Sequence, residues 1–448
     1  MKTIDMTEAI RLCKEAETLN PDDRAILRQE RLKELVNHAR HHSSYFKELY
    51  RDVSDDFTLS DLPITNKTDL MRNYSDWVTD PEVCLTGVLD YIYHNENILE
   101  KYLGKYTALT TSGTTGSPMP MVRDAYHNTL HGAMMQTRLM RDVDPNIMNP
   151  TMYKTASYIV TEKNVSSYSS FLRAQKAYPG YEHNMIAVPL LDSVEKNLDK
   201  IQTFQPDLIT AYPSVLGPVI KAQKEGRIQI APKAIATSAE LLTQNMYRTL
   251  RETFQCPILN NYCSTEGGEA AMSCREGYLH INDDWVIIEP VDKDGQPVKE
   301  GEWSDGILVT DLTNYVQPII RYYMSDRIRI HTEPCACGSS FPVMEIRGRV
   351  GENITVGGKE ILGLSLIYIL EKVEGVFNIQ LVQTGDTSFE VRMIPEEESK
   401  KQEIFEKFKK HVIEFFQENE CGDVQIVLSP EGLIHNANGG KIKPIIVK

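Results

Sequence analysis

The chain lacks an apolar run long enough to cross a membrane. Its 448 residues contain no stretch of the roughly 18 consecutive apolar residues that a transmembrane helix needs. Residues 1–5 also lack the apolar segment of a signal peptide. We therefore expect a cytoplasmic protein without a membrane span.

Positive charge is scarce as well. The chain has 48 Lys and Arg against 63 Asp and Glu, which is a net charge of −15. This balance argues against a nucleic-acid partner, so an anionic ligand would need a local basic or amide-lined site. Cysteine is also sparse: eight cysteines in a long chain without an export signal indicate thiols or metal ligands, not a disulfide framework.

The order of apolar patterns along the chain predicts the fold class. Residues 1–50 have helical periodicity, with Leu32, Leu35 and Val36 on one face, and a helical N-terminal segment is expected over about residues 1–100. Further on, strands are predicted at 185–190, 208–211, 235–237 and 258–261, and helices at 125–140, 194–204, 214–224 and 242–254. The alternation predicts βαβ units and an α/β fold with a mostly parallel sheet.

Two further regions follow the predicted sheet. Residues 277–330 have an antiparallel β pattern, and residues 353–448 have the pattern of a small α+β domain with helices at 364–371 and 400–417. The charged, glycine-containing run at 348–352 is the expected hinge between a large domain, 1–347, and this small one. About two or three subdomains are what this chain length predicts.

The run at 110–118 is rich in hydroxyl groups and glycine, and it follows a strand-like segment at 105–109. Its central residues are Ser112, Gly113, Thr114, Thr115 and Gly116. Loop N–H and O–H groups without protein partners are suited to phosphate oxygens. A flexible linker is the alternative, but linkers rarely separate a strand from a long helix. The run lacks the Gly-Lys-Ser/Thr of a Walker A loop, which excludes the commonest mononucleotide cradle.

A second candidate site follows the predicted strand at 258–261. An aromatic ring at Tyr262 can stack on a base, and the carboxylate of Glu266 can hold a metal that bridges phosphates. Cys263, Ser264 and Thr265 lie between them. The motif is weak alone, because Gly-rich turns after strands are common, and stronger beside the first loop. Asp326 ends another strand-like run and could bind ribose hydroxyls; a surface Asp is the alternative.

Cysteines also form a possible metal site. Cys335 and Cys337 lie in a C-x-C-G turn, and Cys274 and His280 lie on an earlier turn-to-strand segment. Four protein ligands of this kind would suit a structural Zn²⁺. Free thiols are the alternative, and His331 or Cys263 could replace one ligand.

Together these runs resemble the adenylate-forming superfamily of acyl- and aryl-CoA ligases. The resemblance is carried by residues 111–118, 238–240, 262–266, 326, 348–349 and 440–441. It is closest to the phenylacetate–CoA ligase-like branch, through residues 38–46 and 62–70. Met119, where many relatives have lysine, and Cys263, where glycine is frequent, depart from the pattern.

The resemblance implies a mobile small domain and two half-reactions that use ATP, Mg²⁺ and coenzyme A. A carboxylate would attack the α-phosphate to give acyl-AMP, and a thiol would then displace AMP. The 112–116 loop would close over the β- and γ-phosphates, Thr265 would contact the α-phosphate, and Glu266 would hold Mg²⁺. Lys441 would reach the α-phosphate and the substrate carboxylate. The remaining implied nucleotide contacts are Ser238, Ala239, Glu240, Asn261, Tyr262, Cys263, Ser264, Asp326 and Arg349.

The predicted function is therefore an AMP-forming acid–thiol ligase for an aryl or medium acyl acid. Tyr153, Tyr212, Pro213 and Asn260 are the expected substrate-pocket residues. Transfer of the adenylate to a carrier protein or an amine is the first alternative. A catalytically silent nucleotide-binding protein and an ADP-releasing phosphotransferase are the others, and a homodimer is possible.

Overall fold

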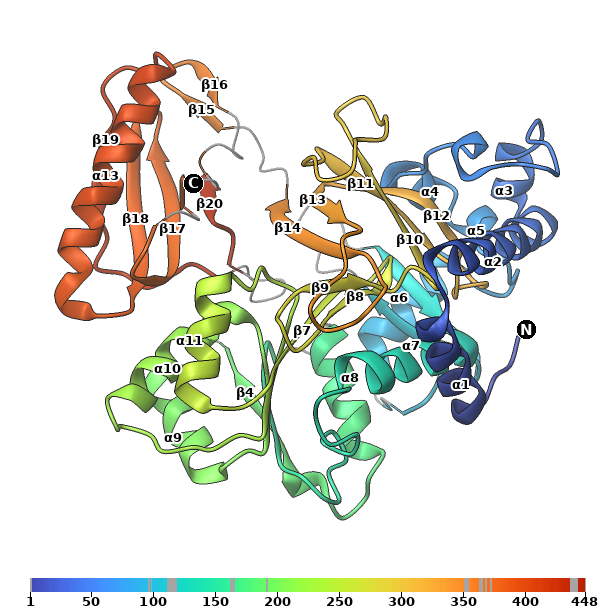
Figure 1. Cartoon of the computed structure of the whole chain (residues 1–448), viewed down its shortest axis with the longest axis horizontal. Helices are drawn as coiled ribbons and strands as arrows, with labels where there is room; N and C mark the ends of the chain where they lie inside the picture. Colours follow the sequence, from blue (N-terminus) through green and yellow to red (C-terminus); the bar gives the residue numbers. More distant parts are fainter. Residues whose placement is uncertain are drawn as a thin grey trace.

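The structure, a computed structural model, describes residues 2–95, 97, 99–110, 119–161, 166–190, 192–349, 354–361, 366, 369–370, 373–435 and 442–447. These residues form a large lobe, 2–349, and a small lobe, 354–447 (Figure 1). Within these ranges no helix has the length and apolar character that a membrane crossing requires.

Helices form the start of the chain, as its periodicity predicts. They are α1 (Met6–Thr18), α2 (Pro21–His42), α3 (Ser44–Leu49), η1 (Leu59–Asp61), α4 (Lys67–Arg72), α5 (Tyr74–Trp77) and α6 (Leu85–His94). Helix α2 begins where Asn20 caps the backbone N–H of Asp23 and a proline occupies the first turn. Its Leu32, Leu35 and Val36 side chains are fully buried, which confirms the predicted apolar face.

A nine-stranded sheet crosses the large lobe in the order β13-β14-β9-β8-β7-β6-β5-β3-β4. Its strands are β3 (Thr155–Ile159), β4 (Met185–Pro189), β5 (Leu208–Ala211), β6 (Ala234–Ser238), β7 (Ile258–Ser264), β8 (Gly268–Ser273), β9 (Leu279–Ile281), β13 (Asp326–His331) and β14 (Val343–Arg349). Strands β3 to β7 run parallel, which confirms the βαβ prediction, and the other half of the sheet is antiparallel.

Helices cover both faces of the parallel half. They are α7 (Ala125–Met134), η2 (Met135–Leu139), α8 (Ser166–Lys176), η3 (Glu182–Asn184), α9 (Val194–Phe204), η4 (Pro213–Val215), α10 (Leu216–Lys224) and α11 (Gln244–Phe254). Helices α9, α10 and α11 share one apolar cluster with β5 and β6, and α7 belongs to another. The predicted helix at 125–140 is an α-helix only to Met134 and then widens into the π-helical turn η2.

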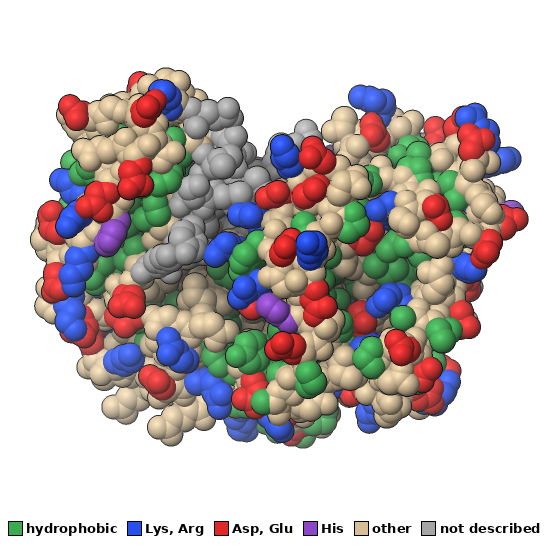
Figure 2. All heavy atoms as spheres, turned by 45° about the horizontal axis from the view of Figure 1, so that its top comes forward, with side chains coloured by type: hydrophobic (Ala, Val, Ile, Leu, Met, Phe, Trp, Pro, Cys, Tyr) green, Lys and Arg blue, Asp and Glu red, His purple; other side chains and the backbone are tan. Residues whose placement is uncertain are grey.

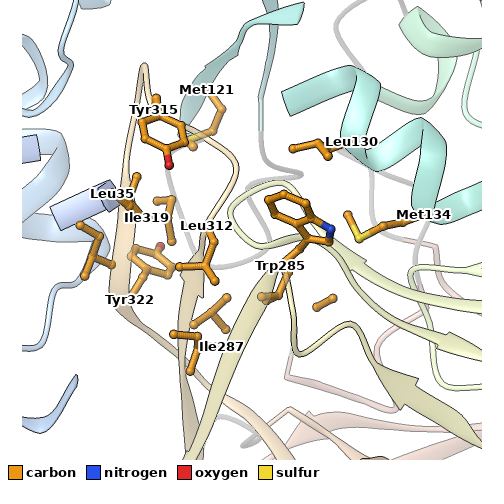
Figure 3. Close-up of a cluster of buried hydrophobic side chains, with 14 of the residues drawn as sticks. Leu35, Met121, Leu130, Met134, Trp285, Ile287, Leu312, Tyr315, Ile319 and Tyr322 are labelled. Atoms are coloured by element: carbon orange, nitrogen blue, oxygen red, sulfur yellow. The ribbon is translucent and has the colours of Figure 1, made fainter. Parts of the chain in front are cut away.

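Small antiparallel units complete the large lobe. They are the pair β1 (Thr107–Thr110) and β2 (Pro120–Arg123), and the sheet β10 (Val286–Val291), β11 (Gly306–Asp311) and β12 (Ile319–Met324). Figure 3 shows how their side chains meet helix α7: Trp285 lies near Leu130 and Met134, while Leu312 and Ile319 face Leu35 of α2. One core therefore joins the N-terminal helices, α7 and the antiparallel strands.

Buried charges hold the N-terminal helices onto this core. The side chain of Asp284 is fully buried and accepts from Arg138 at 2.8 and 2.9 Å. Arg31 of α2 lies 3.6 Å from the same carboxylate, and its guanidinium stacks 3.2 Å from the centre of the Trp285 ring. Breaking a buried pair of this kind typically costs about 3–5 kcal/mol, because one charge stays behind uncompensated.

The small lobe has a sheet and a core of its own. Its elements are β15 (Ile354–Val356), β16 (Lys359–Ile361), β17 (Val376–Gly385), β18 (Ser388–Pro395), η5 (Glu398–Lys400), α13 (Lys401–Glu418), β19 (Gln425–Leu428) and β20 (Ile445–Val447). Phe408, Val412 and Phe416 of α13 are buried against the β19-β18-β17-β20 sheet. Most of the helix predicted at 364–371 lies outside the described residues, as do residues 350–352 of the expected hinge, so the hinge stays a prediction.

The two lobes touch where β17 meets α10. Asn378 donates to the carbonyl of Ser214 at 2.8 Å, and Phe377 packs so closely on Gly217 that an added Cβ would lie 2.8 Å from the Phe377 Cβ. Asn245 also donates to Glu396 at 2.6 Å. Figure 2 shows a notch at the top of the molecule between the lobes, with Lys and Arg side chains of the large lobe beside it.

Candidate active site

The carboxyl ends of β6 and β7 bring two of the sequence-predicted segments together. Their parallel register places Ser238 opposite Asn261, so residues 238–240 lie beside the start of the 261–266 motif. Ala239 has φ of +69°, in the left-handed region that costs a non-glycine residue about 1–2 kcal/mol. Backbone strain of this kind concentrates at ligand sites.

Glu240 links this edge to the loop after β5 and to the end of the chain. One carboxylate oxygen accepts from the backbone N–H of Ser214, and the other accepts from the backbone N–H of Ile442, both at 3.0 Å. Ile442 directly follows Lys441, which itself lies outside the described residues. The small lobe is thus hydrogen-bonded to the large one at residues 238–240, which are among the predicted nucleotide contacts.

The turn between β7 and β8 carries Thr265 and Glu266. Its shape is held by a hydrogen bond from the Gly267 N–H to the Ser264 hydroxyl at 2.8 Å, and by Arg123, which donates to the Thr265 carbonyl at 2.8 Å. Thr265 and Glu266 are only half-buried, so a ligand can reach them. This turn therefore presents a hydroxyl and a carboxylate at the edge where β6 and β7 end.

Asp326 lies close to the same turn. It begins β13 and is buried. In the antiparallel register of β13 and β14 its backbone lies opposite that of Arg349. Met324, two residues earlier, contacts the Ser264 hydroxyl through its sulfur at 3.9 Å. The side chain of Arg349 lies outside the described residues, as do Ser112, Gly113, Thr114, Thr115 and Gly116 of the predicted phosphate loop.

The strands flanking the predicted phosphate loop are described. Thr110 pairs with Pro120, so β1 and β2 are antiparallel neighbours on either side of residues 111–118 in the sequence. The backbone N–H of Val122 donates to Gln317 at 2.8 Å, which fixes β2 to the core. Arg123 at the end of β2 then reaches the β7–β8 turn, so the strand that leaves the loop is tied directly to the turn that carries Glu266.

The four predicted substrate-pocket residues do not all lie at the same end of the sheet. Tyr212 and Pro213 follow β5 at the carboxyl edge of the sheet, beside the Glu240 hydrogen bonds, and Asn260 lies on β7 next to Thr237 of β6. Tyr153 does not join them. It precedes β3, at the opposite end of the parallel strands, and its hydroxyl donates to Asp144 at 2.6 Å. Because Tyr153 precedes its strand, it lies at the edge of the sheet away from the other three residues, and its place in the pocket stays a prediction.

The cysteine cluster is brought together as predicted. One ligand atom from each of Cys274, His280, Cys335 and Cys337 lies within 4.8 Å of the others. The Cys274 and Cys335 sulfurs are 3.9 Å apart, and the Cys337 sulfur is 3.4 Å from His280 Nε2. His280 Nδ1 donates to the Phe341 carbonyl at 2.8 Å, which leaves Nε2 free to face the thiols.

A buried polar cluster behind the β7–β8 turn was missed from the sequence. Glu269 of β8 pairs with His131 of α7, and the His131 ring lies so close to Gly268 that an added Cβ would be 2.1 Å from its Cε1 atom. Burial raises the pKa of the Glu269 carboxyl, but the charges of His131 and Arg123 outweigh burial and hold that pKa at about 2. A single His in a helix and a single Glu in a strand carry no local signal of such a pair.

The sequence is related to known proteins, although no family model matches it. It is 21% identical to Protein CapK of Staphylococcus aureus over 317 residues, 68% of this chain and 63% of that protein, so it spans less than two thirds of that relative. It is 25% identical to the phenylacetate-coenzyme A ligase of Thermus thermophilus over 372 residues, 78% of this chain and 75% of that enzyme.

Solved structures with the same architecture include 2-hydroxyisobutyryl-CoA ligase. Its postadenylation state in complex with R3-HIB-AMP aligns with a TM-score of 0.69 and 15% identity, covering 97% of this chain and 92% of that one. Its thioesterification state, with 2-HIB-AMP and CoA, aligns with a TM-score of 0.58 and 16% identity, covering 97% and 91%. This chain thus shares the fold of 2-hydroxyisobutyryl-CoA ligase and is similar in sequence to a phenylacetate-coenzyme A ligase.

The contact between Gly268 and His131 leads to a testable prediction about the stability of the β7–β8 turn. Gly268→Ala should lower the thermal unfolding midpoint more than Gly226→Ala. Both glycines have positive φ, +60° and +71°, but nothing lies within 4 Å of a Cβ at Gly226. Both variants should lose about 1 kcal/mol from backbone strain, and Gly268→Ala about 1–3 kcal/mol more from overpacking. Equal midpoints would show that the ring does not confine the turn.

Proposed function

We propose that the protein is an ATP-dependent, AMP-forming carboxylate–CoA ligase that acts on an aryl or medium acyl acid through an acyl-AMP intermediate. The observation that carries the proposal is the meeting of residues 238–240 and 261–266 at one edge of the sheet, with Ile442 of the small lobe held there by Glu240. Met324, two residues before Asp326, contacts Ser264 of the same motif. The sequence relationship to a phenylacetate-coenzyme A ligase supports it.

The residues present fit an adenylate. The ring of Tyr262 is suited to stacking on adenine, and Asp326 to the ribose hydroxyls. The half-buried carboxylate of Glu266 is the kind of oxygen ligand that Mg²⁺ takes, and Thr265 beside it supplies a hydroxyl for the α-phosphate. Bound Mg²⁺ would offset phosphate charge. The chain around it would hold the nucleotide in line with the acid.

The proposed reaction has two steps, adenylation of the acid and transfer of the acyl group to CoA. A carboxylate oxygen forms a bond to the α-phosphorus while the bond to pyrophosphate breaks. The thiolate sulfur of CoA then bonds to the acyl carbon, and AMP leaves with that oxygen. Because carboxylate and triphosphate repel, the first step needs concentrated positive charge, which Lys441 would contribute beside Glu266 and its metal.

Acid-dependent nucleotide turnover tests the proposal. Purified protein with Mg·ATP and a panel of aryl and medium-chain acids should release pyrophosphate and AMP with at least one acid, and should form a thioester when CoA is present. Glu266→Gln should lower the rate of pyrophosphate release about 10²-fold or more, as expected for loss of one electrostatic stabiliser.

The nucleotide and acyl products identify the alternatives. ADP as the nucleotide product would contradict adenylation and indicate a phosphotransferase. If acyl-AMP accumulates in the presence of CoA but is consumed by an amine or a carrier protein, then that amine or carrier protein is the acceptor instead of CoA. Near-normal pyrophosphate release by Glu266→Gln would remove Glu266 from the metal site.

Lys441 should matter for one half-reaction only. We expect Lys441→Ala to abolish acyl-AMP synthesis, because its charge would meet the phosphate and carboxylate only in the first transition state. Thioester formation from supplied acyl-AMP and CoA should stay within about tenfold of wild type. The two rates are measured on the same preparation, with Lys443→Ala as the control on the same segment. An equal loss in both assays would assign Lys441 to folding or CoA binding instead.

We also propose a structural Zn²⁺ at Cys274, His280, Cys335 and Cys337. A tetrahedral zinc with ordinary bond lengths would separate two thiolate sulfurs by about 3.8 Å, and a sulfur from an imidazole nitrogen by about 3.6 Å. The corresponding separations of 3.9 and 3.4 Å are close to these values. The ion would pin the 335–337 turn to β9. The proposed function also includes a cytoplasmic location and assembly as a homodimer.

Metal analysis tests the zinc proposal. Protein purified without chelators should contain about one Zn²⁺ per chain, as a closed four-ligand site requires. The double variant Cys335→Ser and Cys337→Ser should lose the metal and lower the thermal unfolding midpoint together. Cys84→Ser, which changes an exposed cysteine away from the cluster, should alter neither. Zinc-free wild-type protein would overturn the proposal.

A further inference from the structure

The polar cluster behind the β7–β8 turn is almost entirely buried. His127 and Thr313 are fully buried, while Asp311 and His131 are 1% and 5% exposed. The cluster joins α7 to β8 and to the segment after β11, at a depth where each polar group needs a protein partner. None of these residues was needed for the nucleotide contacts proposed above, so the cluster requires an explanation of its own.

The Thr313 hydroxyl is the centre of the cluster. It donates to an Asp311 carboxylate oxygen at 2.5 Å, and it lies 2.8 Å from His127 Nδ1 and 3.0 Å from His131 Nε2. The opposite edge of the His131 ring meets Glu269, through both its carboxylate and its backbone N–H. A continuous chain of polar contacts therefore runs from Asp311 through Thr313 and His131 to Glu269.

This geometry is better suited to hydrogen bonding than to a metal ion. His127, His131 and Asp311 each offer a ligand atom within 4.8 Å of the others, as metal ligands would. The Thr313 hydroxyl contacts all three side chains and so fills the place between them. These hydrogen bonds join α7 to the segment after β11 through Thr313, while His127 Nε2 and Asp311 Oδ2 have no hydrogen-bond partner among the described residues.

The cluster acts on the turn that carries Thr265 and Glu266. Glu269 lies three residues after Glu266 and is held by His131, while Arg123 holds the Thr265 carbonyl at 2.8 Å on the other side. Between them Gly268 rests against the His131 ring without space for a side chain. The turn is thus fixed at both ends by residues of β2 and α7, the two elements that follow the predicted phosphate loop.

We propose that His131 and Glu269 are positioning residues for the adenylation step, because they set the β7–β8 turn and with it the placement of Glu266 and Thr265. This inference rests on the proposed function. A displacement of about 1 Å in catalytic groups can cost 10²-fold in rate, so loss of the pair should be visible in kinetics before it is visible in folding.

The test compares Glu269→Gln with wild type in both half-reactions. Glu269→Gln should lower kcat/KM for acid-dependent pyrophosphate release about 10–10²-fold and raise the Mg²⁺ concentration needed for half-maximal rate. Added Mg²⁺ should restore part of the loss. Thioester formation from supplied acyl-AMP and CoA, which does not use the metal contact, should stay within about twofold. His131→Asn is the second variant, should the first fail to fold.

Glu289→Gln is the matched control. Glu289 also pairs with a cation inside the large lobe, accepting from Arg321 at 2.9 and 3.1 Å, and its side chain is 15% exposed against 23% for Glu269. The control should lower the thermal midpoint while leaving the ratio of the two half-reaction rates unchanged. Calorimetric binding of Mg·ATP, which requires no acid, adds a second readout that Glu269→Gln should weaken and Glu289→Gln should not.

The outcomes separate this inference from the proposed function. Wild-type protein that neither binds Mg·ATP nor releases pyrophosphate would contradict the proposed function itself. An active wild type with Glu269→Gln unchanged, or with both half-reactions lowered equally, would overturn the positioning role alone. A selective loss of adenylation with raised Mg²⁺ demand would establish it.

Discussion

The parallel pairing of β6 with β7 is the constraint on which the candidate site depends. With Ser238 opposite Asn261, the segments after both strands emerge side by side at one edge of the sheet. A shift of one residue would turn Asn261 and its neighbours to the other face. The register is secured because Ile235 and Ile258 are buried under α10 and α11, while Leu259 packs toward α7. Apolar burial on both faces thus decides where the polar loops meet.

Glu240 extends this constraint to the small lobe. Its two oxygens accept from the N–H groups of Ser214 and Ile442, so one carboxylate connects the loop after β5, the end of β6 and the segment after Lys441. Phe377 against Gly217 adds an apolar contact between the lobes. Contacts of this kind would have to be released if the small lobe moves during the proposed reaction cycle.

The negative net charge of the chain means that ATP phosphates would have to be bound by a few groups placed within the site. A chain with a net charge of −15 offers ATP no general attraction, so the phosphates depend on a few placed groups. Arg123 is one cation in this region, yet its described contacts are to the turn backbone. In the proposed account, Glu266 with its metal and Lys441 provide the remaining positive charge.

Local patterns predicted the elements well and the polar contacts poorly. Helix α9 matches its prediction of 194–204, because Ser193 caps it and the apolar periodicity is regular. The four cysteine-cluster residues were found because paired thiols are conspicuous in a cysteine-poor chain. The His131–Glu269 pair joins residues 138 positions apart, and no pattern in either segment points to the other. A side-chain type does not reveal which end of a strand a residue occupies, so the sequence alone did not separate Tyr153 from the other predicted pocket residues.

Transfer of an oxygen atom from the acid to AMP tests the proposed acyl-AMP intermediate most directly. An accepted acid labelled with ¹⁸O in its carboxylate is incubated with the protein, Mg·ATP and CoA, and the products are analysed by mass spectrometry. If the carboxylate attacks the α-phosphorus, the AMP released by the thiol carries one labelled oxygen and the pyrophosphate carries none. Label in pyrophosphate or inorganic phosphate, or unlabelled AMP beside a completed thioester, would contradict an acyl-AMP intermediate.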